Sequence, residues 1–236
     1  MKKIILSPPF SNLRVFNLYK NVTRIVGSYT VYSRPGIYRV LSTMRKCNTG
    51  YTNNVGLRNP GIHKCKDLPY IVSISALEAG DWHLLLDVLE TKENVLGVEF
   101  NVSCPNADVL GLNSEVIDRA NSLFKYVIIK MPHLVTRKEL VKYLSLGNFI
   151  LHISNTRPSE LGGISGTSLI DVNIEAIKYV KQYFPERKII AGGGIYSLSD
   201  LYRYKAVGAD YYSLSTILLS IFKTYKIIKG FYNEFK

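Results

Sequence analysis

The sequence predicts a closed (β/α)8 barrel built from residues 1–236 as a single domain. Eight short apolar segments alternate with segments whose apolar residues have helical spacing. Most of the eight are nearly continuous apolar runs, as expected of parallel strands that are covered on both sides. Eight strand–helix repeats in one domain of this length favour a barrel, with a doubly wound sheet as the alternative.

The expected strands are Ile4–Pro8, Arg24–Thr30, Tyr70–Ser75, Gly97–Ser103, Tyr126–Met131, Phe149–Ser154, Lys188–Gly192 and Ala209–Ser215. The stretch Arg34–Leu68 is rich in Gly, Asn, Pro and basic residues. It is expected to form a long loop over one end of the barrel, and ordered loops of this length are often functional.

Helices are expected between the strands. Ser75-x-x-Glu78 and Thr136-x-x-Glu139 have the spacing of capping boxes. Apolar residues recur at helical spacing over Asn173–Phe184, and Ile217–Phe235 is expected to close the chain as its last helix.

The composition is that of a soluble globular protein, with 47% hydrophobic and 20% charged residues. The longest apolar stretch, Tyr211–Phe222, is too short to span a bilayer, and Pro8-Pro9 ends the apolar start too early for a signal peptide. Three cysteines provide neither an even disulfide set nor a zinc spacing. We therefore expect a cytoplasmic protein with no metal site and no membrane attachment.

The formal net charge of +12 raises the question of nucleic-acid binding. The Lys and Arg residues form no run of five, and they are densest in the C-terminal tail, at Lys223, Lys226, Lys229 and Lys236. Scattered charge of this kind is typical of a solvated surface, so the sequence argues against a nucleic-acid partner.

In a parallel barrel the carboxyl ends of the strands converge on one mouth. The residues expected there are Gly27 and Ser28, Asn53, Asn101 to Asn106, Lys130, Asn155 and Thr156, Gly192 to Gly194, and Ser215 and Thr216. This set combines a thiol, a lysine and several carboxamides, an arrangement suited to binding a polar substrate.

Two of these residues suggest chemistry. Cys104 lies between Asn101 and Asn106, and a thiol with a reference pKa near 8.5 can act as a base at neutral pH. The alternative is an ordinary buried thiol. Lys130 ends an apolar strand, where its charge requires an anion or a polar cofactor unless the side chain reaches water at the rim.

The loops Ala191–Ile195 and Ser213–Thr216 follow the last two strands, the place where barrel enzymes often bind phosphate. Glycine-rich turns that only allow tight connections are the alternative. A third small-residue loop, Leu161–Gly166, is expected to contact the same ligand.

These motifs resemble those of the dihydroorotate dehydrogenases, a family of FMN-dependent barrels of pyrimidine synthesis. Asn101–Asn106 resembles the catalytic loop of the family, Asn53–Gly61 its substrate loop, and Val26–Thr30 with Arg34–Gly36 its flavin loop. The remaining similar segments follow in the family's order: Ser154–Thr156, Gly162–Gly166, Ala191–Ile195 and Gly208–Asp210.

The resemblance implies roles for individual residues. Cys104 would take the C5 proton of dihydroorotate while FMN accepts hydride from C6, and a cysteine base indicates the cytosolic class 1. Lys130 would favour negative charge on the reduced flavin. The substrate would be bound by Asn53, Val55, Gly56, Leu57, Asn101, Asn106, Asn155 and Thr156. The FMN would be bound by Ser28, Asn101, Lys130, Ser154, Gly166, Gly193, Gly194, Ser215 and Thr216. Class 1 relatives are often homodimers.

The chain departs from the family pattern in three ways. Gly27 occupies the position of a second lysine, Ser215 replaces a glycine, and the chain is shorter than usual. Two alternatives therefore remain: a flavin-binding barrel of the same ancestry with little turnover, and an enzyme of the dihydrouridine synthase type that acts on tRNA.

Overall fold

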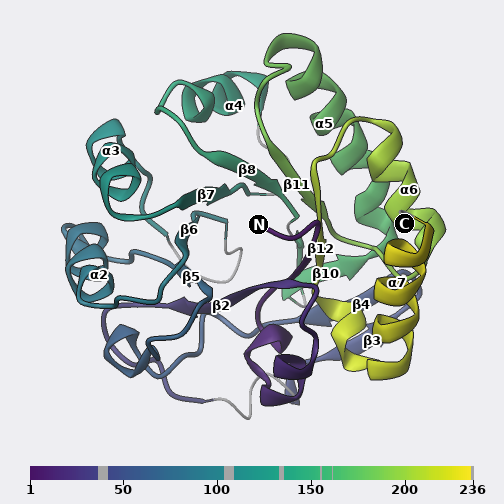
Figure 1. The fold of residues 1–236 in the computed structure, drawn as a ribbon, viewed down its shortest axis with the longest axis horizontal. Helices are drawn as coiled ribbons and strands as arrows, with labels where there is room; N and C mark the ends of the chain where they lie inside the picture. The colour runs from purple at the N-terminus through teal and green to yellow at the C-terminus, as the bar shows by residue number, and fades with distance from the viewer. Residues whose placement is uncertain (37–41, 104–108, 133–135, 155, 161, 235–236) are drawn as a thin grey trace.

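A computed structural model describes residues 1–36, 42–103, 109–132, 136–154, 156–160 and 162–234. They form a closed barrel of parallel strands surrounded by helices, which is the predicted fold class (Figure 1). The strand order around the barrel is β1-β12-β11-β8-β7-β6-β5-β2. The doubly wound sheet considered as an alternative is therefore wrong.

All eight predicted barrel strands are confirmed, and each begins and ends within two residues of the expected bounds. They are β1 (Ile4–Leu6), β2 (Thr23–Tyr29), β5 (Ile71–Ile74), β6 (Gly97–Asn101), β7 (Tyr126–Lys130), β8 (Ile150–Ile153), β11 (Ile189–Gly192) and β12 (Tyr211–Leu214). The first strand closes the barrel, because Ile4 pairs with Tyr212 of β12 and Ile5 pairs with Thr23 of β2.

The α-helices lie outside the strands (Figure 1). They are α2 (Asp81–Glu90), α3 (Ser114–Leu123), α4 (Arg137–Leu144), α5 (Ile170–Tyr183), α6 (Leu198–Ala206) and α7 (Ile221–Glu234). Short 3-10 helices are η1 (Phe10–Asn12), η2 (Arg14–Leu18), η3 (Ile62–Lys64), η4 (Thr167–Leu169) and η5 (Thr216–Leu219). None of the described helices is long and apolar enough to cross a membrane.

One of the two predicted capping boxes is confirmed. The Thr136 hydroxyl accepts a hydrogen bond from the Glu139 N–H at 3.2 Å, and the Glu139 carboxylate accepts one from the Thr136 N–H at 2.9 Å. The prediction at Ser75 was wrong, because its hydroxyl donates to the Asn101 carbonyl and α2 begins only at Asp81. The buried Ser75 hydroxyl satisfies its hydrogen bonding inside the barrel and therefore does not cap a helix.

Two helix boundaries differ from the prediction. The helix expected over Asn173–Phe184 begins three residues earlier, at Ile170. The helix expected over Ile217–Phe235 is divided into η5 and α7, with Ser220 in extended conformation between them.

The barrel interior changes from apolar to polar along its axis. A fully buried layer consists of Ile5, Ile25, Ile71, Ile128 and Ile190. Because side chains alternate along a strand, the next inward residue lies two positions further toward the carboxyl end. On β1 and β5 those residues are Ser7 and Ser73, both buried. The polar layer therefore faces the end where the strands terminate.

A second sheet, called the cover sheet here, consists of β3 (Arg45–Cys47), β4 (Gly50–Asn53), β10 (Gly162–Gly166) and β9 (Arg157–Ser159) in antiparallel order β3-β4-β10-β9. The expectation that Arg34–Leu68 is a loop throughout was therefore wrong, because β3, β4 and η3 lie within it. The loop expected at Leu161–Gly166 is also mostly a strand, with Leu161 outside the described residues. Tyr51 and Ser165 of the cover sheet face the barrel mouth across a cavity.

We predict that Gly166→Ala destabilises the protein by about 1 kcal/mol or more. Gly166 has φ +136°, and a Cβ there would lie 1.7 Å from the Thr49 carbonyl oxygen, so the cover sheet would have to shift. Urea unfolding provides the measurement. The matched control is Gly111→Ala, where no described atom lies within 4 Å of the added carbon. Equal free energies of unfolding for the two variants would contradict the prediction.

Candidate functional site

A cavity of about 730 Å³ opens at the carboxyl ends of the barrel strands, against the cover sheet. Its volume is in the range of cofactor and substrate sites. The charged residues among its described lining residues are Arg58 and Lys130, and no described lining residue is an Asp or Glu. The cavity is therefore suited to anionic ligands.

Most of the predicted site residues line this one cavity. They are Ser28, Asn53, Val55, Gly56, Leu57, Asn101, Lys130, Ser154, Thr156, Gly193, Gly194, Ser215 and Thr216. Gly166 does not line it and lies instead against Thr49, so its absence of a side chain serves sheet packing. The predicted residues Cys104, Asn106 and Asn155 lie outside the described residues.

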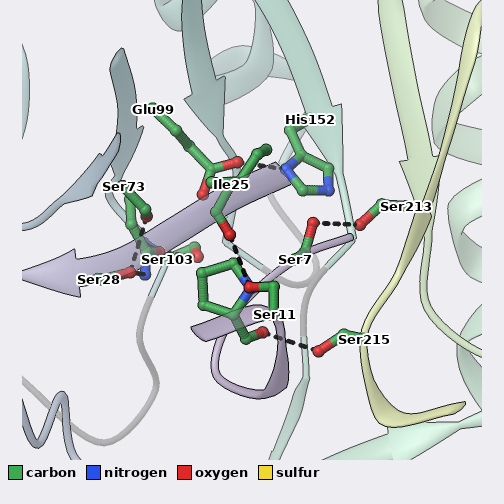
Figure 2. Close-up of polar contacts among 12 residues, drawn as sticks. Ser7, Ser11, Ile25, Ser28, Ser73, Glu99, Ser103, His152, Ser213 and Ser215 are labelled. Carbon is green, nitrogen blue, oxygen red and sulfur yellow. Dashed lines mark hydrogen bonds and ion pairs between the residues drawn. The ribbon is translucent and has the colours of Figure 1, made fainter. Parts of the chain in front are cut away.

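The carboxamide of Asn101, at the end of β6, is held by two serines. Its Nδ2 donates to the Ser28 hydroxyl at 2.8 Å, and Ser28 lies 2.8 Å from the hydroxyl of Ser73 (Figure 2). Its Oδ1 accepts hydrogen bonds from the backbone N–H and the hydroxyl of Ser103. The backbone is thereby fixed up to the residue that precedes Cys104.

Asn12 is a lining residue that the sequence pattern did not reveal. It belongs to η1, and an isolated asparagine of this kind is typical of a turn or an exposed surface. Its Nδ2 donates to the Gly27 carbonyl at 2.8 Å, and its Oδ1 accepts from the Gly27 N–H at 2.9 Å. Asn12 therefore fixes the end of β2, but nothing in its spacing distinguishes it from a surface asparagine.

Hydroxyl groups also join the first and last strands at the mouth. The hydroxyls of Ser7 and Ser213 lie 2.7 Å apart, and the Ser215 hydroxyl donates to the Pro8 carbonyl at 2.7 Å (Figure 2). Tyr196 lies nearby in the same wall, and burial raises the pKa of its phenol to about 12. The phenol is therefore a neutral donor at physiological pH.

The glycine turn after β11 is supported from behind. Asn173 donates to the Gly192 carbonyl at 2.8 Å. The Tyr204 hydroxyl lies 2.9 Å from that oxygen and 2.8 Å from the Gly193 carbonyl. Because both carbonyls accept hydrogen bonds from inside the protein, the turn is held in place, and Gly193 and Gly194 line the cavity.

Beneath the cavity lies a buried pair formed by Glu99 and His152. The Glu99 Oε2 atom lies 2.6 Å from His152 Nδ1, and both side chains are almost completely inaccessible to solvent (Figure 2). In the sheet, Lys130 pairs with Asn101 on one side and with His152 on the other. The lysine that lines the cavity therefore neighbours this pair.

Burial and the neighbouring charges determine which member of the pair is protonated. Burial lowers the pKa of His152 and outweighs the attraction of Glu99. Burial alone would raise the pKa of Glu99, but the hydrogen bond from His152 and the charge of Lys130 lower it. A neutral imidazole therefore donates from Nδ1 to an ionised carboxylate at neutral pH.

Comparison with known proteins identifies relatives. The dihydroorotate dehydrogenase B (NAD(+)) catalytic subunit of Thermotoga maritima is 29% identical over 197 residues, which cover 70% of this chain and 72% of that protein. The protein of the same name from Saccharolobus solfataricus is 28% identical over 203 residues, covering 75% and 69%. No family model matches the chain.

These relatives support the resemblance seen in the sequence, that of a divergent member of the dihydroorotate dehydrogenase family. A crystal structure of DHODH from Eimeria tenella in complex with ferulenol superposes with a TM-score of 0.68 over 92% of this chain and 76% of that one. At 15% identity this likeness supports the barrel fold alone. The names of the curated relatives favour a dihydroorotate dehydrogenase-like function over the tRNA-modifying alternative.

We predict that the free energy of unfolding falls as the pH is lowered from 7 through about 6.5. His152 has a lowered pKa in the folded state, so below the unfolded value only the unfolded chain takes up this proton. The slope contributed by one such group is at most about 1.4 kcal/mol per pH unit. Glu99 does not interfere, because its lowered pKa confines its effect to pH values below about 4.5.

Urea unfolding at several pH values measures this dependence. His152→Gln should reduce the slope between pH 7 and 5.5, whereas His63→Gln, at an exposed position, should leave it unchanged. An unchanged slope in His152→Gln would assign the titration to another group.

Proposed function

We propose that the protein is an FMN-dependent oxidoreductase that converts dihydroorotate to orotate in pyrimidine synthesis. The observation that carries this proposal is the composition of the cavity. It combines carboxamides, two cationic side chains and small-residue turns, without a described acidic residue, at the mouth of a barrel of this family. Orotate and the phosphate of FMN are both anionic.

The residues present fit FMN. Gly193, Gly194, Ser215 and Thr216 line one part of the cavity and would hold the phosphate and ribityl chain through backbone N–H groups and hydroxyls. A Cβ at Gly192 would lie only 2.6 Å from the Ser154 hydroxyl, so glycine keeps the end of β11 closely packed against a residue of the cavity wall. FMN, when bound, would supply the hydride acceptor.

The ring of the cofactor would lie near Ser28, Asn101, Ser154 and Lys130. The hydrogen bonds of Asn101 to Ser28 and Ser103 hold its carboxamide in one orientation, so little ordering is needed on binding. The Lys130 ammonium would stabilise negative charge on the reduced ring, as expected of a cation in a partly desolvated cavity.

The substrate would be bound by Asn53, Asn101, Thr156 and the Val55–Leu57 segment, all in the cavity wall, together with Asn106 and Asn155. Cys104 would act as the general base that takes the C5 proton. Its position in the sequence supports this role, because Ser103 lines the cavity and directly precedes it.

A flavin-binding barrel with little turnover is a second candidate, favoured by Gly27. Gly27 lines the cavity at the position where the family carries a second lysine, and it brings no side chain to the site. The absorption spectrum of the purified protein separates the two functions. A flavin spectrum that bleaches anaerobically on addition of dihydroorotate supports the first function, and one that stays oxidised supports the second.

We predict that Cys104→Ser slows anaerobic flavin reduction by dihydroorotate at pH 7 by about 100-fold or more, because an alcohol is a much weaker base than a thiol. Stopped-flow absorbance measures the rate. The matched control is Cys47→Ser in β3, a cysteine that does not line the cavity and should keep the parental rate. Equal rates in Cys104→Ser and the parent would remove Cys104 from the mechanism.

Lys130→Met should lower the flavin content of the purified protein or slow its reduction, because the change removes the positive charge from beside the bound ring. The ratio of flavin to protein absorbance and the reduction rate provide the readouts. The control is Lys138→Met on the exposed surface of α4. If both quantities equal those of the parent, Lys130 has no part in binding or chemistry.

A further inference from the structure

Arg58 brings a guanidinium group into the wall of the cavity. Its Nη1 donates to the Pro35 carbonyl at 3.2 Å. Its Nε is buried, and no described residue accepts a hydrogen bond from it. A buried hydrogen-bond donor that lacks an acceptor destabilises the protein. The side chain as a whole is only partly buried and lines the cavity, so a carboxylate bound there can accept hydrogen bonds from the guanidinium.

The loop that carries Arg58 is rigidly attached to the barrel. The side chain of Asn59 accepts from the N–H groups of Thr30 and Gly61 at 3.2 and 2.8 Å. It donates to the Thr30 hydroxyl at 2.9 Å and to the Leu57 carbonyl at 2.8 Å. Asn59 also exchanges two backbone hydrogen bonds with Arg34. The position of the Arg58 backbone is therefore fixed before any ligand binds.

The residue directly before Arg58 has an unfavourable backbone conformation. Leu57 has φ +56° and is the only non-glycine residue with positive φ in the described part of the chain. A conformation of this kind is unfavourable and persists where the surrounding contacts enforce it, often at a functional site. Here the Asn59 side chain provides that enforcement, and the consequence is the placement of Arg58 in the cavity wall.

The charge around Arg58 is uncompensated. No Asp or Glu precedes Asp67 in the sequence, whereas twelve Lys and Arg do. The other 18 Lys and Arg balance the 18 acidic residues, so the first 66 residues account for the whole net charge of +12. Lys130 has the buried Glu99 nearby, but Arg58 forms no ion pair with a described residue. A cleft with a single sign of charge concentrates ligands of the opposite sign.

We infer that Arg58 determines substrate specificity by binding the carboxylate of the substrate, so that the protein selects carboxylate-bearing pyrimidines over neutral ones. The inference rests on the proposed function and deepens it. A charge-assisted hydrogen bond from a guanidinium to a carboxylate is among the strongest in proteins. A neutral pyrimidine offers this cation no charged acceptor, and sites built to bind a polar group reject analogues that lack it.

Isothermal titration calorimetry of the purified protein tests this inference with three ligands. Orotate carries the pyrimidine ring and a carboxylate, uracil carries the ring alone, and benzoate carries a carboxylate on a different ring. The variant Arg58→Met should weaken orotate binding by about tenfold to a hundredfold and leave uracil binding within about twofold of the parent.

The matched control is Arg45→Met. Arg45 is exposed on β3, does not line the cavity, and donates to the Met44 carbonyl at 3.0 Å. The control should bind all three ligands like the parent, which would exclude a general effect of net charge. If Arg45→Met weakens orotate as much as Arg58→Met does, the carboxylate is not bound by Arg58 in particular.

The remaining outcomes separate the inference from the proposed function. Equal orotate affinity in Arg58→Met and the parent overturns the role of Arg58 and leaves the function intact. If the parent binds benzoate through Arg58 but neither pyrimidine, the proposed function is wrong and the carboxylate site stands. If the parent binds no carboxylate, Arg58 is not such a site.

A loss of uracil binding in Arg58→Met would indicate a damaged cavity, and Arg58→Lys then decides. If Arg58→Lys binds orotate again, the positive charge at this position binds the carboxylate. If Arg58→Lys does not bind orotate, the inference is overturned.

Discussion

The site depends on the hydrogen bonding of β1 to both β2 and β12. This pairing closes the sheet, and a closed parallel barrel places the carboxyl end of every strand on the same side. Residues far apart in sequence, such as Ser7 and Ser213, then meet within hydrogen-bond distance. Without closure, the asparagines, the lysine and the glycine turn would lie along an open edge.

Closure also decides where polar groups can be tolerated inside the protein. The isoleucine layer that includes Ile5 and Ile128 fills the barrel and excludes water from below. Above it, buried polar groups are acceptable because they bond to one another, as Asn101 does with Ser28 and Ser103. The polar layer is therefore both the top of the core and the base of the cavity.

The sequence predicts the barrel well because its strands are continuous apolar runs, a pattern that burial on both sides requires. It also predicts the residues at the cavity, because the carboxyl ends of the strands in a parallel barrel meet at one mouth. The cover sheet could not be predicted, because β10 (Gly162–Gly166) contains three glycines and pairs with β4 more than 100 residues earlier. Side chains at Gly162 and Gly166 would clash with the backbone of Asn53 and Thr49, and no local sequence pattern predicts these contacts.

The functional contributions of Asn12 and Arg58 also escape sequence reasoning. Each is an ordinary residue by type and spacing. Only folding brings Asn12 next to the Gly27 carbonyl and Arg58 next to the Pro35 carbonyl. Ser75 shows the opposite error, because a good local capping signal lost to a hydrogen bond inside the barrel. Contacts between distant segments determine what these residues do, and no local sequence pattern predicts those contacts.

The pair of Glu99 and His152 constrains how this protein can change during evolution. Replacing His152 alone would leave the buried Glu99 carboxylate without this hydrogen-bond donor, and replacing Glu99 alone would leave the buried imidazole N–H without its acceptor. Each loss is on the order of 1–3 kcal/mol, whereas replacing both by apolar residues can be nearly neutral. Single-step substitutions at these positions are therefore disfavoured even where the double change is acceptable. In a divergent lineage the two positions should be inherited together, as a unit that connects β6 to β8 beneath the cavity.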